Sequence, residues 1–131
     1  MKTAFSRKLR NIPYLYVFLI APDNDAPCVI GWGHKTTADK ARRYAARNNL
    51  PYIALEDGFL RSLDLGCKGA QPLSLVVDHT GIYYDATEPS DLENLLNGSG
   101  GDLEGQLQSV QHAIEAIKRH DLSKYNHAPR A

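Results

Sequence analysis

Apolar and polar residues follow one another along the chain in a pattern that predicts strands separated by a helix. A short apolar run, Cys28-Val29-Ile30, leads into Gly31-Trp32-Gly33. Small apolar residues then recur at helical spacing from about Thr37 to Asn48. A second apolar run, residues 51–55, continues directly into Glu56-Asp57-Gly58. Strand, helix and strand in this order predict a βαβ unit with parallel strands.

The helix of this unit has recognisable start and stop signals. Thr36, with Asp39 three residues later, resembles a capping box at its start. Asn48-Asn49 is expected to end it, because asparagine is favoured where a helix terminates.

The segments on either side of this unit are less regular. Residues 13–22 form the most apolar stretch, but it is far shorter than the roughly 20 residues needed to span a bilayer, so a buried strand or a short core helix is expected there. Residues 73–78 and 82–85 read as strands, either paired as a hairpin or placed as successive strands of the sheet. Ser90 and Glu93 predict a second capping box and a helix.

A long amphipathic helix is predicted near the end of the chain. Residues 97–101, rich in glycine, read as a flexible linker before it. The helix itself is expected over about residues 102–120, with one apolar stripe formed by Leu103, Leu107, Val110, Ile114 and Ile117. Docking of this stripe on its own domain is the favoured interpretation, and a two-helix coiled coil is the alternative.

Composition and charge narrow the classes of protein. With 131 residues, 43% hydrophobic residues and no net charge, the chain fits one globular domain and gives no reason to expect a nucleic-acid partner. Residues 1–50 contain nine Lys/Arg and three acidic residues, which could favour phosphate or anionic lipid but is also typical of a solvated helix face. Cys28 and Cys67 fit no metal-binding spacing, so reduced thiols, no metal and no cofactor are expected.

The first candidate site is the turn after the first predicted strand. Its residues are Gly31, Trp32, Gly33, His34 and Lys35. Ligands of open parallel sheets bind outside the carboxyl ends of the strands. At this position the two glycines would admit a ligand close to the backbone. His34 and Lys35 would offer hydrogen-bond donors to a phosphate or a sugar carboxylate. The motif lacks the Walker pattern and the full GxGxxG spacing, so on the motif alone a tight turn with a packed Trp32 and a solvated Lys35 is the favoured interpretation.

The second candidate site follows the second predicted strand. Glu56-Asp57-Gly58 is followed by Arg61 and Ser62, so two carboxylates and a guanidinium lie at the end of a buried strand. A partly desolvated carboxylate there could act as a general base, with the arginine orienting it or binding an anion. Alternatively, Asp57 caps the next turn and Glu56 forms a structural ion pair with Arg61. Asp78, His79 and Asp85 are read as ordinary turn formers.

Five ordered blocks of the sequence resemble one family. They are residues 31–35, 55–62, 72–78, 81–86 and 122–126, and they resemble the capsule polysaccharide proteins of the KpsC/LipA type. The resemblance covers about residues 30–129. It implies an α/β fold, in which a Rossmann-like parallel sheet forms the front half of a GT-B glycosyltransferase. Residues 1–27 would be an N-terminal segment that the resemblance does not cover, residues 28–120 the acceptor-side lobe, and residues 121–131 the start of a linker to a second lobe.

The resemblance also implies an activity and its partners. Such proteins are retaining β-Kdo transferases of capsule polysaccharide biosynthesis and transport, which use CMP-Kdo to build a Kdo linker on a phosphatidylglycerol-type lipid together with the capsule assembly machinery. They act in the cytoplasm at the inner membrane, and peripheral membrane attachment is left open. Asp57, with Glu56 as the alternate, would transfer a proton or position the substrate; Gly31 to Lys35, Gly58, Arg61 and Ser62 would bind it.

The family's His-Pro motif, expected to hold the CMP phosphate, would lie beyond Ala131. The chain is therefore expected to be a truncated domain that is inactive alone. The alternative is a non-catalytic module that binds a lipid-linked glycan or a capsule-assembly partner.

Overall fold

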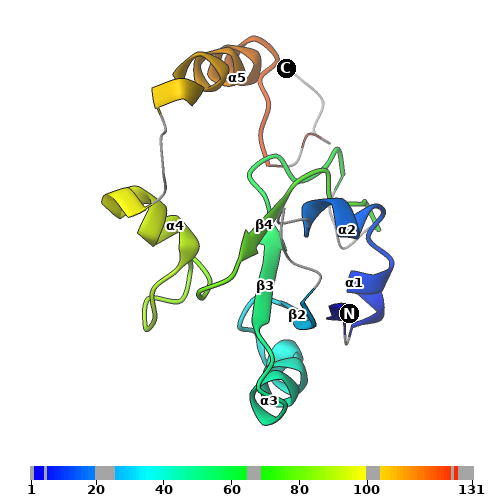
Figure 1. Ribbon diagram of the computed structural model, residues 1–131. Helices are drawn as coiled ribbons and strands as arrows, with labels where there is room; N and C mark the ends of the chain where they lie inside the picture. The colour runs from blue at the N-terminus through cyan, green and yellow to red at the C-terminus, as the bar shows by residue number, and fades with distance from the viewer. Residues whose placement is uncertain are drawn as a thin grey trace.

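A four-stranded sheet forms the centre of the protein. The computed structural model describes residues 2–4, 6–19, 26–64, 69–99, 104–124 and 126. The strands lie in the order β1 (Lys2–Ala4), β2 (Cys28–Trp32), β3 (Tyr52–Asp57) and β4 (Leu75–Asp78) (Figure 1). The first three are parallel, and β4 runs antiparallel to β3. The sheet is thus mixed, and the predicted α/β class with mostly parallel strands is confirmed.

The predicted βαβ unit forms with the expected register. Val29 is opposite Tyr52, and Ile30 is opposite Ile53, so the two predicted strands are neighbours. A 3₁₀ turn at Thr36–Ala38 leads into α3 (Asp39–Arg47), with Asn48 as its C-cap. Ala41 and Ala45 of this helix pack against Val29 of β2. Small helix residues facing a β-branched strand residue let the helix lie close to the sheet.

The opposite face of the sheet carries the larger hydrophobic core. Its buried members are Leu9, Ile12, Leu19, Cys28, Ile30, Ile53 and Leu55. Leu9 belongs to α1 (Arg7–Arg10), and Leu19 follows α2 (Leu15–Phe18). The apolar stretch at residues 13–22 therefore contains a short helix, which is one of its two predicted forms; residues 20–22 lie outside the described residues. The sheet is covered by α3 on one face and by α1 and α2 on the other.

Two local predictions are wrong, and a third is confirmed. Residues 82–85 form turns and not a strand, because the segment after β4 folds back toward the end of β2. Thr36 and Asp39 do not form a capping box: the N-cap position has no side-chain hydrogen bond, and the Asp39 carboxylate binds Arg42 at 2.9 Å. The second capping box does form, since Ser90 Oγ accepts from the Glu93 N–H at the start of α4 (Asp91–Asn94).

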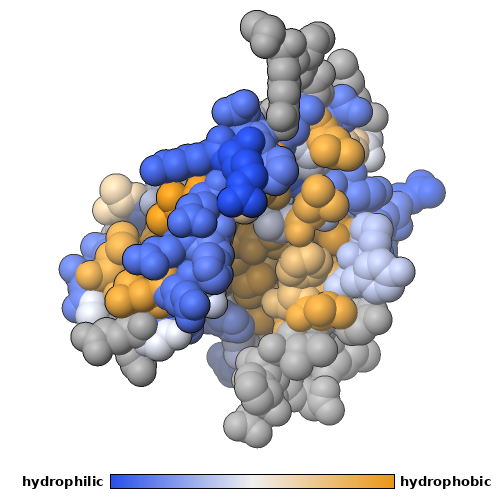
Figure 2. Space-filling model, turned by 90° about the horizontal axis from the view of Figure 1, so that it is seen from above, coloured by the Kyte–Doolittle hydropathy of each residue, from blue (hydrophilic) through white to orange (hydrophobic). Residues whose placement is uncertain are grey.

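The last helix is shorter and less buried than predicted. A 3₁₀ turn at Glu104–Gln106 precedes α5 (Leu107–Arg119), and residues 102 and 103 lie outside the described residues. Figure 1 shows α5 apart from the sheet. Leu107, Val110 and Ile114 are 57%, 48% and 45% exposed, so the stripe does not dock on this domain as predicted. Seen from the side of α5, hydrophobic side chains appear in several patches among hydrophilic ones (Figure 2).

The prediction of a flexible linker at residues 97–101 agrees only partly with the structure. Leu95–Ser99 continue α4 as an irregular π-helical turn, in which Gly98 has a φ of 83°. Gly100 and Gly101, the remaining residues of the predicted linker, lie outside the described residues.

Replacing Leu55 by alanine is expected to lower the free energy of unfolding by about 2–5 kcal/mol, because Leu55 is completely buried and the substitution leaves a cavity. Leu73→Ala is the matched control: Leu73 is 68% exposed, and its truncation should change stability by less than about 0.5 kcal/mol. Urea unfolding followed by circular dichroism measures both. Equal losses in the two variants would contradict this assignment of the core.

Candidate active site at the carboxyl edge of the sheet

The turn after β2 is held against the end of β3 by its backbone. The Gly33 N–H donates to the Leu55 carbonyl at 2.8 Å, and Gly33 has a φ of 54°. A side chain at this position would overlap the Tyr84 hydroxyl, and it would lie 3.4 Å from Glu56 Oε2. Glycine is therefore required both by the conformation and by the space. Close approach also explains Gly31, where a Cβ would overlap the Tyr52 ring.

An ion pair joins the two predicted site clusters. Lys35 Nζ lies 3.1 Å from Glu56 Oε2, with the Lys35 side chain 55% exposed and the Glu56 side chain 9% exposed. Burial alone would lower the pKa of Lys35, but the hydrogen bond and the negative charge of Glu56 outweigh it, so that the pKa is raised above its ordinary value. Glu56 Oε1 accepts from the Asp57 N–H at 3.1 Å. The turn after β2 and the end of β3 therefore meet at the carboxyl edge of the sheet through Lys35 and Glu56.

Asp57 has a different partner from its neighbour. Its Oδ1 accepts from Arg61 Nε at 3.0 Å, and the same guanidinium donates through NH1 to Ser62 Oγ at 2.9 Å and to the Ala70 carbonyl. Arg61 is buried, and its backbone N–H donates to the Lys124 carbonyl at 3.0 Å. The structure therefore contains a structural ion pair, but between Asp57 and Arg61. The alternative pairing of Glu56 with Arg61 is wrong.

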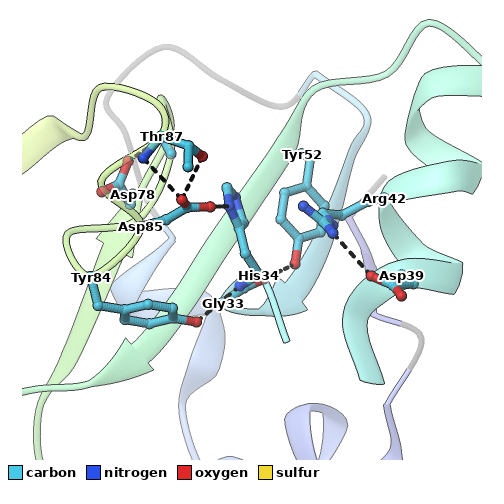
Figure 3. A network of polar contacts seen from close by, with 10 residues as sticks. Gly33, His34, Asp39, Arg42, Tyr52, Asp78, Tyr84, Asp85 and Thr87 are labelled. Carbon is cyan, nitrogen blue, oxygen red and sulfur yellow. Dashed lines mark hydrogen bonds and ion pairs between the residues drawn. The ribbon is translucent and has the colours of Figure 1, made fainter. Parts of the chain in front are cut away.

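Residues of the loop after β4 complete the site. The sequence patterns alone did not identify them as site residues. The His34 N–H donates to the Tyr84 hydroxyl at 3.0 Å, and His34 Nδ1 lies 2.9 Å from Asp85 Oδ2 (Figure 3). Asp85 Oδ1 also accepts from the Thr87 N–H and hydroxyl. The Thr87 hydrogen bonds, followed by that of His34, lower the pKa of Asp85 to about 2. The one sequence feature that could have indicated their role is that Tyr84 and Asp85 fall in residues 81–86, a block that resembles the family.

A pocket opens beside His34. Its volume is about 310 Å³, and its walls are formed by His34, Arg42, Tyr52, His79, Thr80, Gly81 and Glu88. The Tyr52 side chain lies beside His34 in Figure 3, and its hydroxyl donates to the Gly33 carbonyl at 2.7 Å. Burial raises the pKa of Tyr52 to about 12, so the phenol stays neutral at physiological pH. Arg42 is paired with Asp39 in α3.

The predicted site residues fall into separate groups. Lys35 and Glu56 meet at the carboxyl edge of the sheet, whereas His34 is one wall of the pocket that also contains Arg42 of α3. Trp32 packs against the core on the opposite face, and Ser62 is buried with its hydroxyl donating to the Asp64 carbonyl. Gly58 lies under Ser74, where a Cβ would overlap the serine side chain.

No three His, Cys, Asp or Glu side chains in the described part of the chain could together hold a metal ion. Among the same residues, no helix has the length and apolar character needed to cross a membrane. Cys28 is buried in the core, and Cys67 lies outside the described residues.

Comparison with known proteins gives consistent matches. Residues 27–131 match the family described as "Capsule polysaccharide biosynthesis protein". The chain is 50% identical over 129 residues to the capsule polysaccharide modification protein LipA of Neisseria meningitidis serogroup B, covering 95% of this chain and 18% of that protein. It is 42% identical over 96 residues to the lipopolysaccharide-processing protein LpsZ of Rhizobium meliloti, covering 72% of this chain and 22% of that protein.

Two solved structures are also similar. The β Kdo 2,4 transferase of Thermosulfurimonas dismutans KpsC matches with a TM-score of 0.81 and 47% identity, covering 99% of this chain and 44% of that one. The β Kdo 2,7 transferase of the same KpsC matches with a TM-score of 0.59 and 29% identity, with the same two coverages. The chain thus spans less than half of each solved relative, and less than a quarter of each of these curated relatives.

Substituting Gly33 by alanine is expected to destabilise the protein more than substituting Gly69. Both glycines have positive φ, 54° and 89°, so both substitutions introduce backbone strain of about 1–2 kcal/mol. Only at Gly33 would the new methyl group overlap another side chain, Tyr84, which adds about 1–3 kcal/mol of overpacking. Urea unfolding of both variants measures the difference; a Gly69→Ala variant as unstable as Gly33→Ala would rule out the contribution of Tyr84.

Asp85→Asn is expected to make stability less dependent on pH in acid. Because the folded pKa of Asp85 is about 2, below the ordinary value of 3.8, the ionised carboxylate stabilises the fold above pH 4, and this contribution is lost as the pH falls toward 2. The difference in stability between the wild type and Asp85→Asn should therefore shrink over that range, as measured by urea unfolding at several pH values. A difference that stays constant would contradict the lowered pKa.

Proposed function

Because the chain belongs to the family of capsule polysaccharide biosynthesis proteins, we propose that it is the acceptor-side part of a transferase that moves Kdo from CMP-Kdo to a lipid-linked acceptor. The main support is the Lys35–Glu56 pair at the carboxyl edge of a sheet that matches a Kdo transferase with a TM-score of 0.81. Since the solved transferase is more than twice as long as the matched region, the nucleotide-binding residues are assigned to the part that this chain does not span.

The carboxylate best suited to proton transfer is Glu56. In the transfer reaction, the bond from Kdo to the CMP phosphate breaks, a bond to the acceptor oxygen forms, and the acceptor hydroxyl gives up its proton. Glu56 is buried beside the glycine turn, and its Oε2 lies near Gly33 and the Tyr84 hydroxyl that fills the space beside this glycine. Lys35 holds this oxygen in place. A positioned base of this kind accounts for about a hundred- to ten-thousand-fold in rate.

Asp57 is assigned a supporting role in this scheme. Its carboxylate holds Arg61, and Arg61 in turn holds the loop that follows β3 through Ser62 and the Ala70 carbonyl. A carboxylate committed to a buried guanidinium is less available for a substrate proton. The earlier assignment of the reactive role to Asp57 remains a prediction, and the two carboxylates can be separated by mutation.

The greater likeness to the 2,4 transferase favours one product. Identity is 47% with that enzyme and 29% with the 2,7 transferase. We therefore propose that the transferred Kdo is attached through a 2,4 linkage, which nuclear magnetic resonance of the purified product would establish.

Purified alone, the 131-residue chain is expected to give no transfer from CMP-Kdo to a Kdo-bearing lipid acceptor. Holding donor and acceptor together contributes about 7–11 kcal/mol to barrier lowering, and one lobe supplies only part of this positioning. The positive arm is a chimera in which this chain replaces the matched region of the T. dismutans 2,4 transferase. Product is measured by mass spectrometry, and folding by thermal unfolding. A folded chimera without transfer would contradict the proposed function.

In the active chimera, Glu56→Gln is expected to lower kcat by about a hundred- to ten-thousand-fold, because the amide cannot accept the proton. Asp57→Asn should mainly lower the free energy of unfolding, by about 1.5–3 kcal/mol, through loss of the charged hydrogen bond to Arg61. The exposed residue Asp64 provides the matched control, Asp64→Asn, which should change neither quantity. Loss of turnover in stable Asp57→Asn, with full activity in Glu56→Gln, would reverse the two roles.

A further inference from the structure

We propose that the pocket between α3 and the loop of residues 79–88 is a subsite for one sugar ring, in which His34, held by Asp85, offers its Nε2 atom to a sugar hydroxyl. The choice of sugar rests on the proposed function. The pocket is distinct from the Lys35–Glu56 pair: His34 is one of its walls, and neither Lys35 nor Glu56 is. His34 and Lys35 are adjacent in the chain, so a ligand in the pocket would lie next to the carboxylate.

The orientation of the imidazole is fixed by its neighbours. Asp85 Oδ2 lies 2.9 Å from His34 Nδ1, and a carboxylate at this distance requires a proton on that nitrogen. Asp85 is itself held through its other oxygen by the Thr87 N–H and hydroxyl. In the neutral imidazole, the Nδ1–H tautomer leaves Nε2 as an acceptor. Asp85 is therefore a positioning residue that acts through His34.

The pocket walls carry both hydrogen-bond donors and hydrogen-bond acceptors, as the hydroxyl groups of a sugar require. The groups around His34 are Arg42 from α3, Tyr52 from β3, Lys35 from the glycine turn, and His79, Tyr84, Asp85 and Glu88 from the loop. Arg42 is already paired with Asp39, and Lys35 with Glu56. Sugar hydroxyls both donate and accept, and therefore match a wall of mixed imidazole, hydroxyl and carboxylate groups.

The dimensions of the pocket agree with one ring. A volume of about 310 Å³ lies at the small end of ligand pockets, which span about 300–1,000 Å³. A single sugar therefore fits better than a cytidine nucleotide. The half-buried Tyr52 ring provides one rigid wall, since its hydroxyl is bonded to the Gly33 carbonyl and its centroid lies 6.3 Å from that of His34.

The test uses nuclear magnetic resonance of the 131-residue chain labelled with ¹⁵N at histidine. The ring nitrogen shifts report the tautomer of His34 directly, and Nδ1–H is expected in the wild type. In Asp85→Asn this preference should be lost, whereas a purely structural role would leave the tautomer unchanged. A wild-type Nε2–H tautomer would overturn the proposal.

Titration with free Kdo tests the subsite. The Nε2 resonance of His34 and the ring of His79 should shift, while His112, exposed on α5, should not. Asp85→Asn and His34→Gln should each weaken Kdo binding at least tenfold. No shift of His34 with Kdo, or an equal shift with inorganic phosphate, would overturn the sugar subsite. Failure of the chimera to transfer Kdo would instead count against the proposed function, because the tautomer and the titration are measured without turnover.

Discussion

One buried carboxylate holds the loop on which the candidate site depends. Asp78, at the end of β4, is 1% exposed, and its Oδ1 accepts the backbone N–H groups of Thr80, Gly81 and Asp91. Hydrogen bonds from backbone N–H groups compensate a carboxylate for the loss of water. They also fix both ends of the segment from His79 to Asp91. Tyr84 and Asp85 lie within this segment, so their contacts with His34 depend on Asp78.

Small residues on β2 provide the room that these contacts need. Gly31 faces the Tyr52 ring, and Gly33 faces the Tyr84 hydroxyl. Each tyrosine hydroxyl then forms a hydrogen bond with the backbone of the glycine turn. Tyr52 donates to the Gly33 carbonyl, and Tyr84 accepts from the His34 N–H. Gly31 lies in β2 and Gly33 in the turn directly after it, so the two phenols fill neighbouring gaps at the end of this strand. The turn is thus held from two sides by hydrogen bonds to its backbone.

The sequence predicted local elements better than contacts between distant segments. The βαβ unit could be predicted because its apolar periodicity and its asparagine stop signal are local. The strand at residues 82–85 was wrong because Ile82, Tyr83 and Tyr84 have high strand propensity, whereas here Ile82 is completely buried and Tyr84 reaches the glycine turn. Tertiary packing overrode propensity. The His34–Asp85 pair spans 51 positions, and no local pattern contains that information.

The different partners of Glu56 and Asp57 follow from the pleat of β3. Successive strand residues point to opposite faces, so adjacent carboxylates cannot share one environment. Glu56 is opposite Val76 and shares the α3 face with Gly33, which brings it to Lys35. Asp57 is opposite Leu75, which packs against the larger core, and there it meets Arg61. The sequence could place both carboxylates at the strand end, but only the register assigns one to the glycine turn and the other to the loop. A shift of one residue in the register of β3 would exchange the two environments. Burial of the apolar residues Ile53 and Leu55 fixes this register, so these two residues matter to the site as much as the carboxylates do.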